Sequence, residues 1–331
     1  MFYAFRRNPR ERLRSLPVIG KVTAMLFERA DRNGWLSDII SDPQVLWGRS
    51  RLFRFFSQPW EAVGSTPIVT IVVASRNNEA TLRKAVCSLL NQTLHNIEVI
   101  IVDDHSTDGS VHVARDLIMT DSRVRLLINK SRLGTGSSRN NGMKVARGEY
   151  ITFQDGDDTS EPSRLEVQYK SFLKYPSKEL VTCNYVRVNE NGDVIYINNK
   201  RTMRCIISMM FRREKILSEV GYFRDESVSE DSDYYERIKI AFGASCDLLV
   251  FRTLYKALFR SDSSFFGTTK IIQISRENVN FDRYPSTLSR WRELQLEHFE
   301  MKAGRLSHYV PLVHEEQCSE LSRTQAAAGK S

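Results

Sequence analysis

Runs of apolar residues alternate along this chain with segments whose apolar positions repeat every three or four residues. Residues 68–73 form a continuous β-branched run, as in a strand buried on both faces of a parallel sheet. The apolar positions of 82–90 then follow one face of a helix. Further strands are predicted at 97–102, 124–128 and 149–153, and further helices from about 110 and over 136–146. Repeated strand–helix–strand units predict an α/β fold with a doubly wound, mostly parallel sheet and flanking helices.

The pattern after residue 158 is less regular. Asn191-Gly192 lies between apolar runs at 180–188 and 194–198, which predicts a hairpin with a two-residue turn. Ser229 precedes a segment of helical spacing and is predicted to cap that helix. A further helix is predicted at 162–174, and further strands at 206–211, 248–251 and 254–259.

Two extensions flank the α/β region, which we expect over 67–265. Residues 1–66 are rich in arginine and are predicted to form a helical N-terminal extension. Arginines beside apolar residues suit docking to an anionic membrane surface, but they also suit a helical cap whose arginines are solvated. Residues 266–331 are predicted to form a helical C-terminal extension with a frayed tail.

Composition narrows the choice of partner and compartment. The net charge of +8 favours polyanions, but no basic run is interleaved with aromatic residues, so nucleic acid is not expected. The five cysteines include no Cys-x-x-Cys pair, which indicates reduced thiols rather than a disulfide framework or a zinc site. Without a spanning run or a signal peptide, we expect a cytoplasmic protein. Residues 1–66 would allow it to be peripheral on the inner face of the membrane.

Three carboxylates lie within four positions directly after the predicted strand 149–153, at Asp155, Asp157 and Asp158. Such acids repel one another unless a hard cation such as Mg²⁺ or Mn²⁺ binds their oxygens; an Asp/Gly-rich turn is the alternative. Polar residues at 75–78 and 103–104 also follow predicted strands. Because doubly wound sheets bind ligands at the carboxyl ends of their strands, this convergence predicts a site there.

An ordered series of motifs over about residues 67–260 resembles the family 2 glycosyltransferases. It includes the opening strand with Asn77, the sequence VDDHSTDGS at 102–110, RNNG at 139–142, the acidic cluster, and the pair Glu230-Asp231. The resemblance implies a GT-A fold, a nucleotide-sugar donor, a divalent metal (Mn²⁺ or Mg²⁺) and inversion at the anomeric carbon. It also implies a nucleotide-binding half at 67–158 and an acceptor half at 159–265.

The resemblance assigns roles to individual residues. Asp155 and Asp157 match the Asp-x-Asp motif and would hold the metal against the donor diphosphate. Asp231 matches the aspartate of the Glu-Asp motif, the general base, although acids in a first helical turn also simply complement the helix dipole. Asp104 matches the position that hydrogen-bonds the nucleobase. The neighbouring residue, Asp103, could instead cap the following turn. The positions expected to contact the nucleotide sugar are Ser75, Arg76, Asn77, Glu79, Asp103, Asp104, Arg132, Arg139, Asp155 and Gly156.

We therefore expect a metal-dependent inverting glycosyltransferase of the hexosyltransferase type, with a UDP-sugar favoured as donor. The expected acceptor is a glycan, a lipid-linked molecule or a cell-envelope polysaccharide. Arg132 and Arg139 could pair with phosphate or brace an aspartate. Arg76 replaces the aromatic residue that usually precedes Asn77 in the family, which changes the expected stacking on the base. The alternatives are a non-catalytic GT-A-like binding or scaffold subunit and a sugar nucleotidyltransferase; the second would carry a glycine-rich loop that 74–78 lacks.

Overall fold

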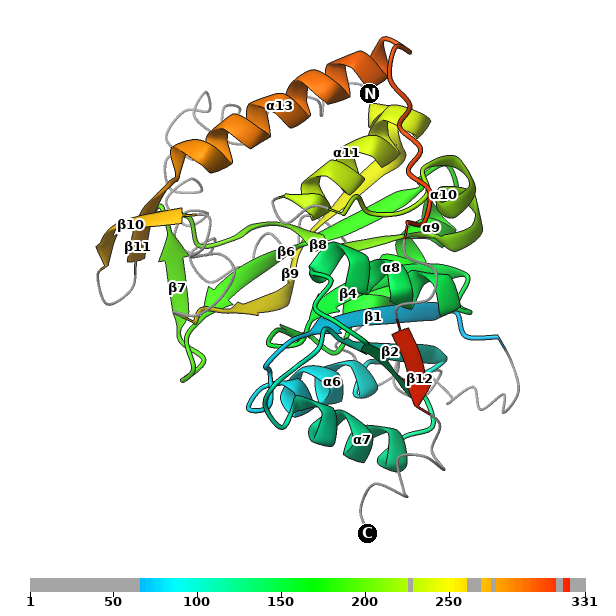
Figure 1. The fold of residues 1–331 in the computed structure, drawn as a ribbon, viewed down its shortest axis with the longest axis vertical. Coiled ribbons are helices and arrows are strands. Elements are labelled where there is room, and N and C mark those ends of the chain that lie inside the picture. The colour runs from blue at the N-terminus through cyan, green and yellow to red at the C-terminus, as the bar shows by residue number, and fades with distance from the viewer. Residues whose placement is uncertain (1–65, 226–228, 261–268, 275–277, 314–317, 322–331) are drawn as a thin grey trace, which may run out of the picture. The chain divides into compact units, whose positions relative to one another are not determined.

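The computed structural model describes residues 66–225, 229–260, 269–274, 278–313 and 318–321 (Figure 1). The predictions made for residues 1–65 lie outside this range. Within it, no helix combines the length and the apolar character needed to cross a membrane.

Four parallel strands form the centre of the sheet, in the order β3-β2-β1-β4. They are β1 (Val69–Ser75), β2 (Ile97–Asp103), β3 (Val124–Asn129) and β4 (Tyr150–Asp155). The intervening helices are α6 (Leu82–Leu90), α7 (Ser110–Thr120) and α8 (Thr135–Val145). The predicted doubly wound parallel sheet is confirmed. Because β4 lies on the opposite side of β1 from β2, the strand order reverses at β1, and ligands of such sheets bind at this point.

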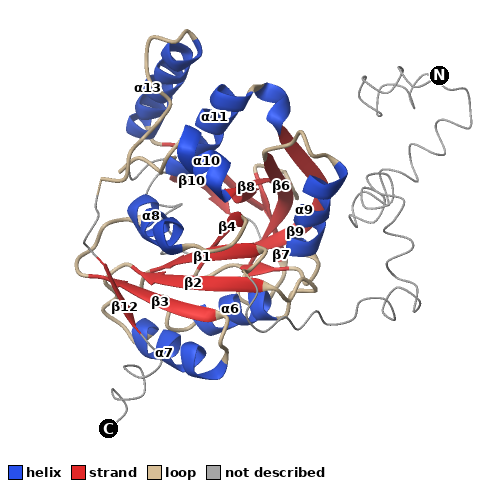
Figure 2. Ribbon diagram, turned by 90° about the vertical axis from the view of Figure 1, so that its right-hand side faces the viewer, coloured by secondary structure: helices blue, strands red, loops and turns tan. Residues whose placement is uncertain are grey.

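Helices cover both faces of the central strands, which is why β1 and β2 are buried along their whole length. One face packs against α6, α7 and α9 (Arg164–Lys174). The other packs against α8, α10 (Arg213–Glu219) and α11 (Glu230–Phe242). Figure 2 shows α6 and α7 on one side of the sheet and α8 on the other. The β-branched run of the sequence therefore corresponds to a strand in contact with two apolar layers.

The second half of the sheet is mixed. β8 (Met203–Arg212) pairs antiparallel with β4, and β6 (Leu180–Val188) pairs antiparallel with β8. β9 (Asp247–Leu258) runs parallel to β6 and antiparallel to the short β5 (Thr159–Ser160). The predicted hairpin forms between β6 and β7 (Val194–Ile197), but its turn spans five residues, 189–193, rather than two. The side chain of Asn189, which accepts a hydrogen bond from the N–H of Asp193, closes this longer turn.

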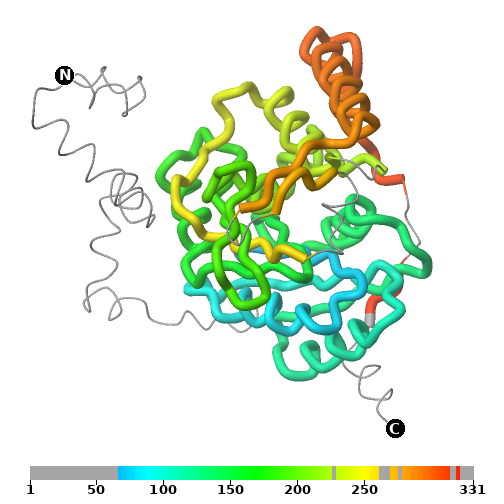
Figure 3. The backbone as a smooth tube through the Cα atoms, turned by 90° about the vertical axis from the view of Figure 1, so that its left-hand side faces the viewer, coloured from blue at the N-terminus to red at the C-terminus, as the bar shows by residue number. Residues whose placement is uncertain are grey.

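The C-terminal segment is only partly helical, so the prediction for residues 266–331 is wrong in part. The helix α13 (Pro285–Lys302) is preceded by the antiparallel pair β10 (Thr269–Ile274) and β11 (Asn278–Arg283). The chain then returns to the parallel half, where β12 (Cys318–Leu321) pairs antiparallel with β3. Figure 3 shows this last strand, in red, beside the cyan and green N-terminal half. β10, β11 and β12 contain polar and charged residues, so a prediction based on apolar runs does not find them.

Candidate active site

The loops that follow β1 and β2 hold each other through side chains of the predicted site. The N–H of Asn77 donates to Ser106 Oγ over 3.0 Å, and Asn77 Oδ1 accepts from the N–H of Thr107 over 2.9 Å. Glu79 Oε2 accepts from the N–H of Gly109 over 3.0 Å. Asn77 has a φ of +51°, a left-handed conformation that asparagine tolerates better than most residues. These two residues therefore fix the shape of the rim above the sheet.

Asp103 and Asp104 both lie at the carboxyl end of β2 and are nearly buried. Asp103 accepts hydrogen bonds from the N–H and the hydroxyl of Ser106, so it caps the following turn. Burial and the charges of Asp108 and Asp104 raise the pKa of Asp103 above its usual range, against the effect of the Ser106 hydrogen bonds. Asp104 organises the loop after β3.

The Asp104 carboxylate accepts three hydrogen bonds. Its Oδ1 accepts from Asn129 Nδ2 over 2.9 Å and from the N–H of Leu133 over 2.7 Å, and its Oδ2 accepts from the N–H of Gly134 over 2.9 Å. Since a carboxylate offers about four lone-pair sites, Oδ2 retains acceptor capacity toward a ligand.

Arg139 on α8 connects two of the predicted motifs. Its Nη2 lies 2.9 Å from Asp155 Oδ1 at the end of β4, and its Nη1 lies 3.1 Å from Glu230 Oε1 at the start of α11. The guanidinium is buried, and its Cζ lies 5.8 Å from the ring centroid of Phe153 and 5.6 Å from that of Phe223. Burial lowers the pKa of Arg139, but the charges of Asp155, Glu230 and Asp231 outweigh it and raise that pKa above its ordinary value. Arg139 is therefore a permanent cation that braces an aspartate, one of the two roles expected for it.

The acidic loop after β4 contains carboxylates in three environments. The side chain of Asp155 is about one-third exposed, whereas Asp157 is more enclosed and lies 3.3 Å from Arg260 Nη2. Burial and the charge of Asp155 raise the pKa of Asp157 to about 6, although Arg260 acts in the opposite direction. Asp158 is buried and accepts hydrogen bonds from the Tyr255 hydroxyl and the N–H of Leu258, each over 2.8 Å. It anchors β9 to this loop and so has a structural role.

Gly156 lies between the two aspartates of the Asp-x-Asp motif because no side chain fits there. A Cβ on this residue would lie 2.6 Å from Asn78 Nδ2 and 2.9 Å from Ser75 Oγ. Its N–H donates to the carbonyl of Ala74, which draws the loop across the end of β1. The predicted residues Ser75 and Gly156 are thus brought into contact.

The carboxylates of Asp155 and Asp157 suit a hard divalent cation. The charge of Asp155 raises the pKa of Asp157. A bound cation would offset the repulsion between the two carboxylates that causes this rise. Mg²⁺ in such sites takes one or two carboxylates and completes its coordination with phosphate oxygens and water. In the described part of the chain, no group of three or more His, Cys, Asp or Glu side chains is placed to hold a metal. The two aspartates would therefore need ligand oxygens from a bound phosphate compound.

Asp231 lies in the first turn of α11, next to Glu230, and its Oδ1 accepts from the N–H of Ser232 over 2.7 Å. The prediction that Ser229 caps this helix through its side chain is wrong. Ser229 has a φ of +59° and makes no capping hydrogen bond with its hydroxyl, although its carbonyl accepts the first helical bond from Asp233. The buried acid of this turn is Asp233, which contacts Arg237, Arg224 and His298.

Arg76 and Arg132 are exposed at the rim, and their expected contacts with a nucleotide stay predictions. Sequence reasoning missed Tyr255 and Arg260, which reach the acidic loop from β9 and the residues after it. No local signal marks them, because they lie about 100 residues from the loop that they contact. The sequence places Asn78 in the polar segment 75–78 but gives it no role of its own. In the structure, Asn78 Oδ1 accepts a hydrogen bond from Arg260 Nη2.

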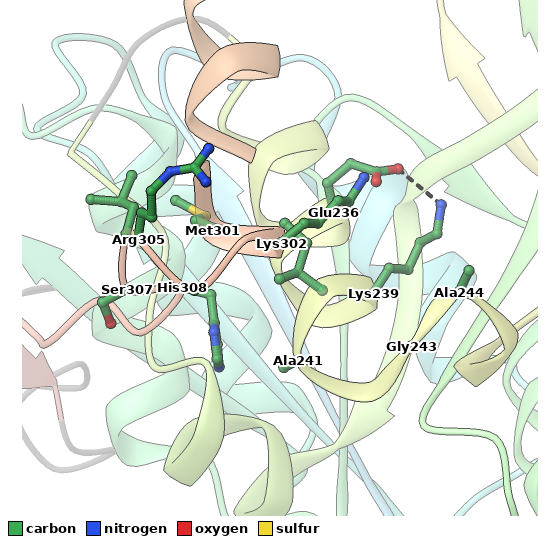
Figure 4. Close-up of a pocket in the computed structure, with 13 residues that line it drawn as sticks. Glu236, Lys239, Ala241, Gly243, Ala244, Met301, Lys302, Arg305, Ser307 and His308 are labelled. Carbon is green, nitrogen blue, oxygen red and sulfur yellow. Dashed lines mark hydrogen bonds and ion pairs between the residues drawn. The ribbon is translucent and has the colours of Figure 1, made fainter. Parts of the chain in front are cut away.

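A cavity of about 820 Å³ lies apart from these acids, between the second half of α11 and residues 301–308 (Figure 4). Lys239, Lys302, Arg305 and His308 line it, together with Glu236, which pairs with Lys239. None of the predicted site residues lines this cavity. The candidate site is instead the open rim formed by the loops after β1, β2, β3 and β4.

Comparison with known proteins agrees with this arrangement. The Glycosyl transferase family 2 model matches residues 70–227. The putative glycosyltransferase EpsH of Bacillus subtilis is 41% identical over 120 residues, which cover 36% of this chain and 34% of EpsH. UDP-Glc:alpha-D-GlcNAc-diphosphoundecaprenol beta-1,3-glucosyltransferase WfgD of Escherichia coli is 35% identical over 127 residues, covering 38% of this chain and 49% of WfgD. The chain thus spans less than half the length of these two relatives.

Among solved structures, TarS (residues 1–349) from S. aureus in complex with UDP-GlcNAc superposes with a TM-score of 0.53. The match covers 72% of this chain and 71% of TarS at 18% identity, so it supports the fold alone. The sheet order, the flanking helices and this likeness identify a GT-A type fold. Residues 70–227 are thus similar to glycosyltransferase family 2.

Proposed function

We propose that this protein transfers a sugar from a UDP-sugar to a hydroxyl group of a lipid-linked or polysaccharide acceptor, with inversion at the anomeric carbon. The observation that carries the proposal is the position of Arg139. This buried cation joins Asp155, at the end of β4, to Glu230, which precedes Asp231. It therefore connects the acids suited to a metal–diphosphate with the candidate base, across about 75 residues of sequence.

Three sets of residues would bind the donor. Asp155 and Asp157 would hold Mn²⁺ or Mg²⁺, which when bound neutralises the diphosphate as it leaves. Asp104 Oδ2 would accept a hydrogen bond from the uracil N–H, since that oxygen accepts only the Gly134 N–H among the described residues. Arg76 and Arg132 are exposed beside these loops, where a guanidinium could pair with phosphate oxygens.

Asp231 would act as the general base. Its carboxylate would take the proton of the acceptor hydroxyl while that oxygen attacks the anomeric carbon. The bond from this carbon to the diphosphate oxygen breaks on the opposite face, and the nucleoside diphosphate leaves with the electron pair. Arg139 would keep Asp155 and the start of α11 at a fixed separation. It would not take part in proton transfer, because its raised pKa keeps it charged.

UDP as the carrier and a lipid-linked acceptor are supported by WfgD, whose name specifies UDP-Glc and a diphosphoundecaprenol acceptor. The shared segment covers only 38% of this chain, so the sugar and the linkage are left open. A cytoplasmic site with peripheral contact on the inner membrane face would be consistent with such an acceptor.

Thermal unfolding with UDP, GDP, CDP and dTDP, each with Mn²⁺ and again with chelator, tests the proposed donor site. A ligand at 100 times its dissociation constant adds about 2.7 kcal/mol to the folded state, which corresponds to a shift of several degrees. We expect a shift with UDP and Mn²⁺, its loss with chelator, and its loss in Asp157→Ala. Asp282→Ala removes an exposed acid on β11 and is the matched control.

Two outcomes would contradict the proposal. No shift with any nucleotide would favour a non-catalytic scaffold role. Release of pyrophosphate instead of a nucleoside diphosphate, when donor and acceptor are both supplied, would indicate nucleotidyl transfer.

A further inference from the structure

Arg260 places a positive charge beside one of the two candidate metal ligands. Its Nη2 lies 3.3 Å from Asp157 Oδ2, and the two side chains are largely enclosed, at 19% and 16% exposure. The charge of Arg187 on β6 acts on the same carboxylate. A divalent cation bound to Asp157 would lie close to a guanidinium, and two cations repel each other strongly where little water separates them. Arg260 therefore opposes the binding of a metal ion on its own.

Asn78 fixes the position of this guanidinium. Asn78 Oδ1 accepts a hydrogen bond from Arg260 Nη2 over 3.2 Å. The asparagine is only 6% exposed; its N–H donates to Ser110 Oγ over 2.7 Å, and its Nδ2 donates to Ser75 Oγ over 3.3 Å. Because Arg260 Nη2 contacts both Asn78 and Asp157, the guanidinium connects the loop after β1 with the acidic loop after β4.

The sheet order puts this connection on the path of a donor diphosphate. β1 lies between β2 and β4, so the loop after β1 separates Asp104, at the end of β2, from Asp155, at the end of β4. In the proposed function the base is bound at Asp104 and the metal at Asp155 and Asp157, so the diphosphate between them crosses the end of β1. Arg260 reaches the same point through Asn78. A guanidinium suits phosphate because it can donate two parallel hydrogen bonds to its oxygens.

We propose that Arg260 makes metal binding depend on the donor. Without a nucleotide, Arg260 stays paired with Asp157 and keeps divalent cations away from it. When a diphosphate binds together with its metal ion, the guanidinium moves to the phosphate oxygens and releases the Asp157 carboxylate. The exchange keeps both residues paired, since Arg260 gains phosphate in place of Asp157 and Asp157 gains the metal in place of Arg260. This inference rests on the proposed function, because it takes the rim to bind a nucleoside diphosphate.

A purely structural role for Arg260 would be to hold the acidic loop to the end of β9. That loop already has such an attachment, because Asp158 accepts hydrogen bonds from the Tyr255 hydroxyl and the N–H of Leu258, each over 2.8 Å. Asp158 is buried, whereas the contact between Arg260 and Asp157 is longer, at 3.3 Å, and partly exposed. The anchored acid and the acid that can exchange its partner are therefore neighbours in the same loop.

Two titrations of the full-length protein test the exchange. The first measures the Kd of Mn²⁺ alone from the electron paramagnetic resonance signal of the free ion, and the second measures the Kd of UDP at saturating Mn²⁺ by calorimetry. In Arg260→Gln we expect Mn²⁺ alone to bind about fivefold more tightly, because a repelling charge is gone. We expect UDP with Mn²⁺ to bind about tenfold more weakly, because a charge-assisted contact with phosphate is lost.

Two further variants separate charge from geometry and from general effects. Arg260→Lys keeps the charge but loses the planar donor group, so Mn²⁺ alone should bind as in wild type while UDP binds more weakly. Arg283→Gln is the matched control. It removes an exposed arginine on β11, which β7, β6 and β8 separate from β4, and should change neither constant.

The opposite signs of the two expected changes distinguish the exchange from a structural role. Weaker binding of both Mn²⁺ alone and UDP in Arg260→Gln would overturn the proposal and indicate a structural clamp. Unchanged Mn²⁺ binding, or unchanged UDP binding, in that variant would overturn it as well. Failure of wild type to bind any nucleotide would contradict the proposed function, whereas tighter binding of Mn²⁺ alone to Arg260→Gln would still support the repulsion between Arg260 and a metal at Asp157.

Discussion

Asp231 and Asp233 lie two positions apart in α11, but their surroundings differ. Asp231 bonds to its own helix turn near the rim, whereas Asp233 is 2% exposed and contacts Arg237, Arg224 and His298. Burial raises the pKa of Asp233, but these partners outweigh burial and hold that pKa below its usual value. Because of this difference, we expect Asp231 to contribute to catalysis and Asp233 to stability, within one helical turn.

We expect Asp231→Asn to lower kcat about a thousandfold with little change in unfolding temperature, because general bases contribute about 10²–10⁴ in rate. Asp233→Asn should instead lower the free energy of unfolding by about 3 kcal/mol, since it leaves Arg237 buried without its counter-charge. Turnover assays and urea unfolding on both variants check this. Normal turnover in Asp231→Asn would remove the assignment of the base.

The acids of the motifs could be predicted from the sequence, but the partners that set their properties could not. Asp155 and Asp157 follow an apolar strand, which is a local signal. Tyr255 reaches the same loop from β9 and Arg260 from the residues after it, and nothing in the sequence near either residue indicates that contact. The sequence gives no sign either that Asp158 bonds to two residues of β9.

At the scale of elements, Glu98 on β2 shows how a buried charge can connect strands. Its side chain is 2% exposed and bonds to Arg125 on β3, to Arg147 after α8, and to the Thr70 hydroxyl on β1. Burial raises the pKa of Glu98, but the hydrogen bonds from Arg125, Arg147 and Thr70 outweigh it and lower that pKa below 4.5. The charged form is therefore favoured in the folded protein.

A group with a lowered pKa in the folded state adds stability above its unfolded pKa and loses it as the pH falls through the folded value. We expect Glu98→Gln to cost about 2 kcal/mol near pH 7, because it weakens the charge-assisted hydrogen bonds from Arg125 and Arg147, although Arg125 keeps Glu320 as a partner. The difference between variant and wild type should shrink below about pH 4.5, as Glu98 itself becomes protonated. Urea unfolding of both proteins from pH 3 to 7 measures this difference in the free energy of unfolding. A difference that does not change with pH would show that packing, not charge, sets the cost.

Elements with a strong apolar period were predictable, and those defined by tertiary pairing were not. The two strands expected at 248–251 and 254–259 are a single strand, β9, whose register with β6 shifts between Val250 and Thr253. This irregularity breaks the apolar alternation, so one strand appeared as two. β12 could not be predicted because its four residues become a strand only by pairing with β3.

At the scale of the whole molecule, the segment after α13 connects the two halves of the fold. The N–H of Tyr222 donates to the carbonyl of Val310, and the N–H of Val310 donates to the carbonyl of Val220. Further on, Glu320 pairs with Arg125 on β3 through two hydrogen bonds. Residues 304–321 lie beyond the matched family segment, so their attachment could not be inferred from the resemblance to known glycosyltransferases.

Gly221 permits the first of these attachments, and its replacement tests how much the returning segment contributes. A Cβ on Gly221 would lie 2.0 Å from the carbonyl oxygen of Val310, and its φ is +75°. Gly243 has a similar φ of +83°, but a Cβ there would meet nothing within 4 Å. Both alanine variants pay the cost of a left-handed backbone, about 1–2 kcal/mol, and only Gly221→Ala displaces the segment. We expect Gly221→Ala to lose at least about 2 kcal/mol more than Gly243→Ala in urea unfolding, with faster amide exchange at Val310 and in β12. If both variants lose the same free energy of unfolding, the contact of Gly221 with the segment after α13 does not stabilise the protein.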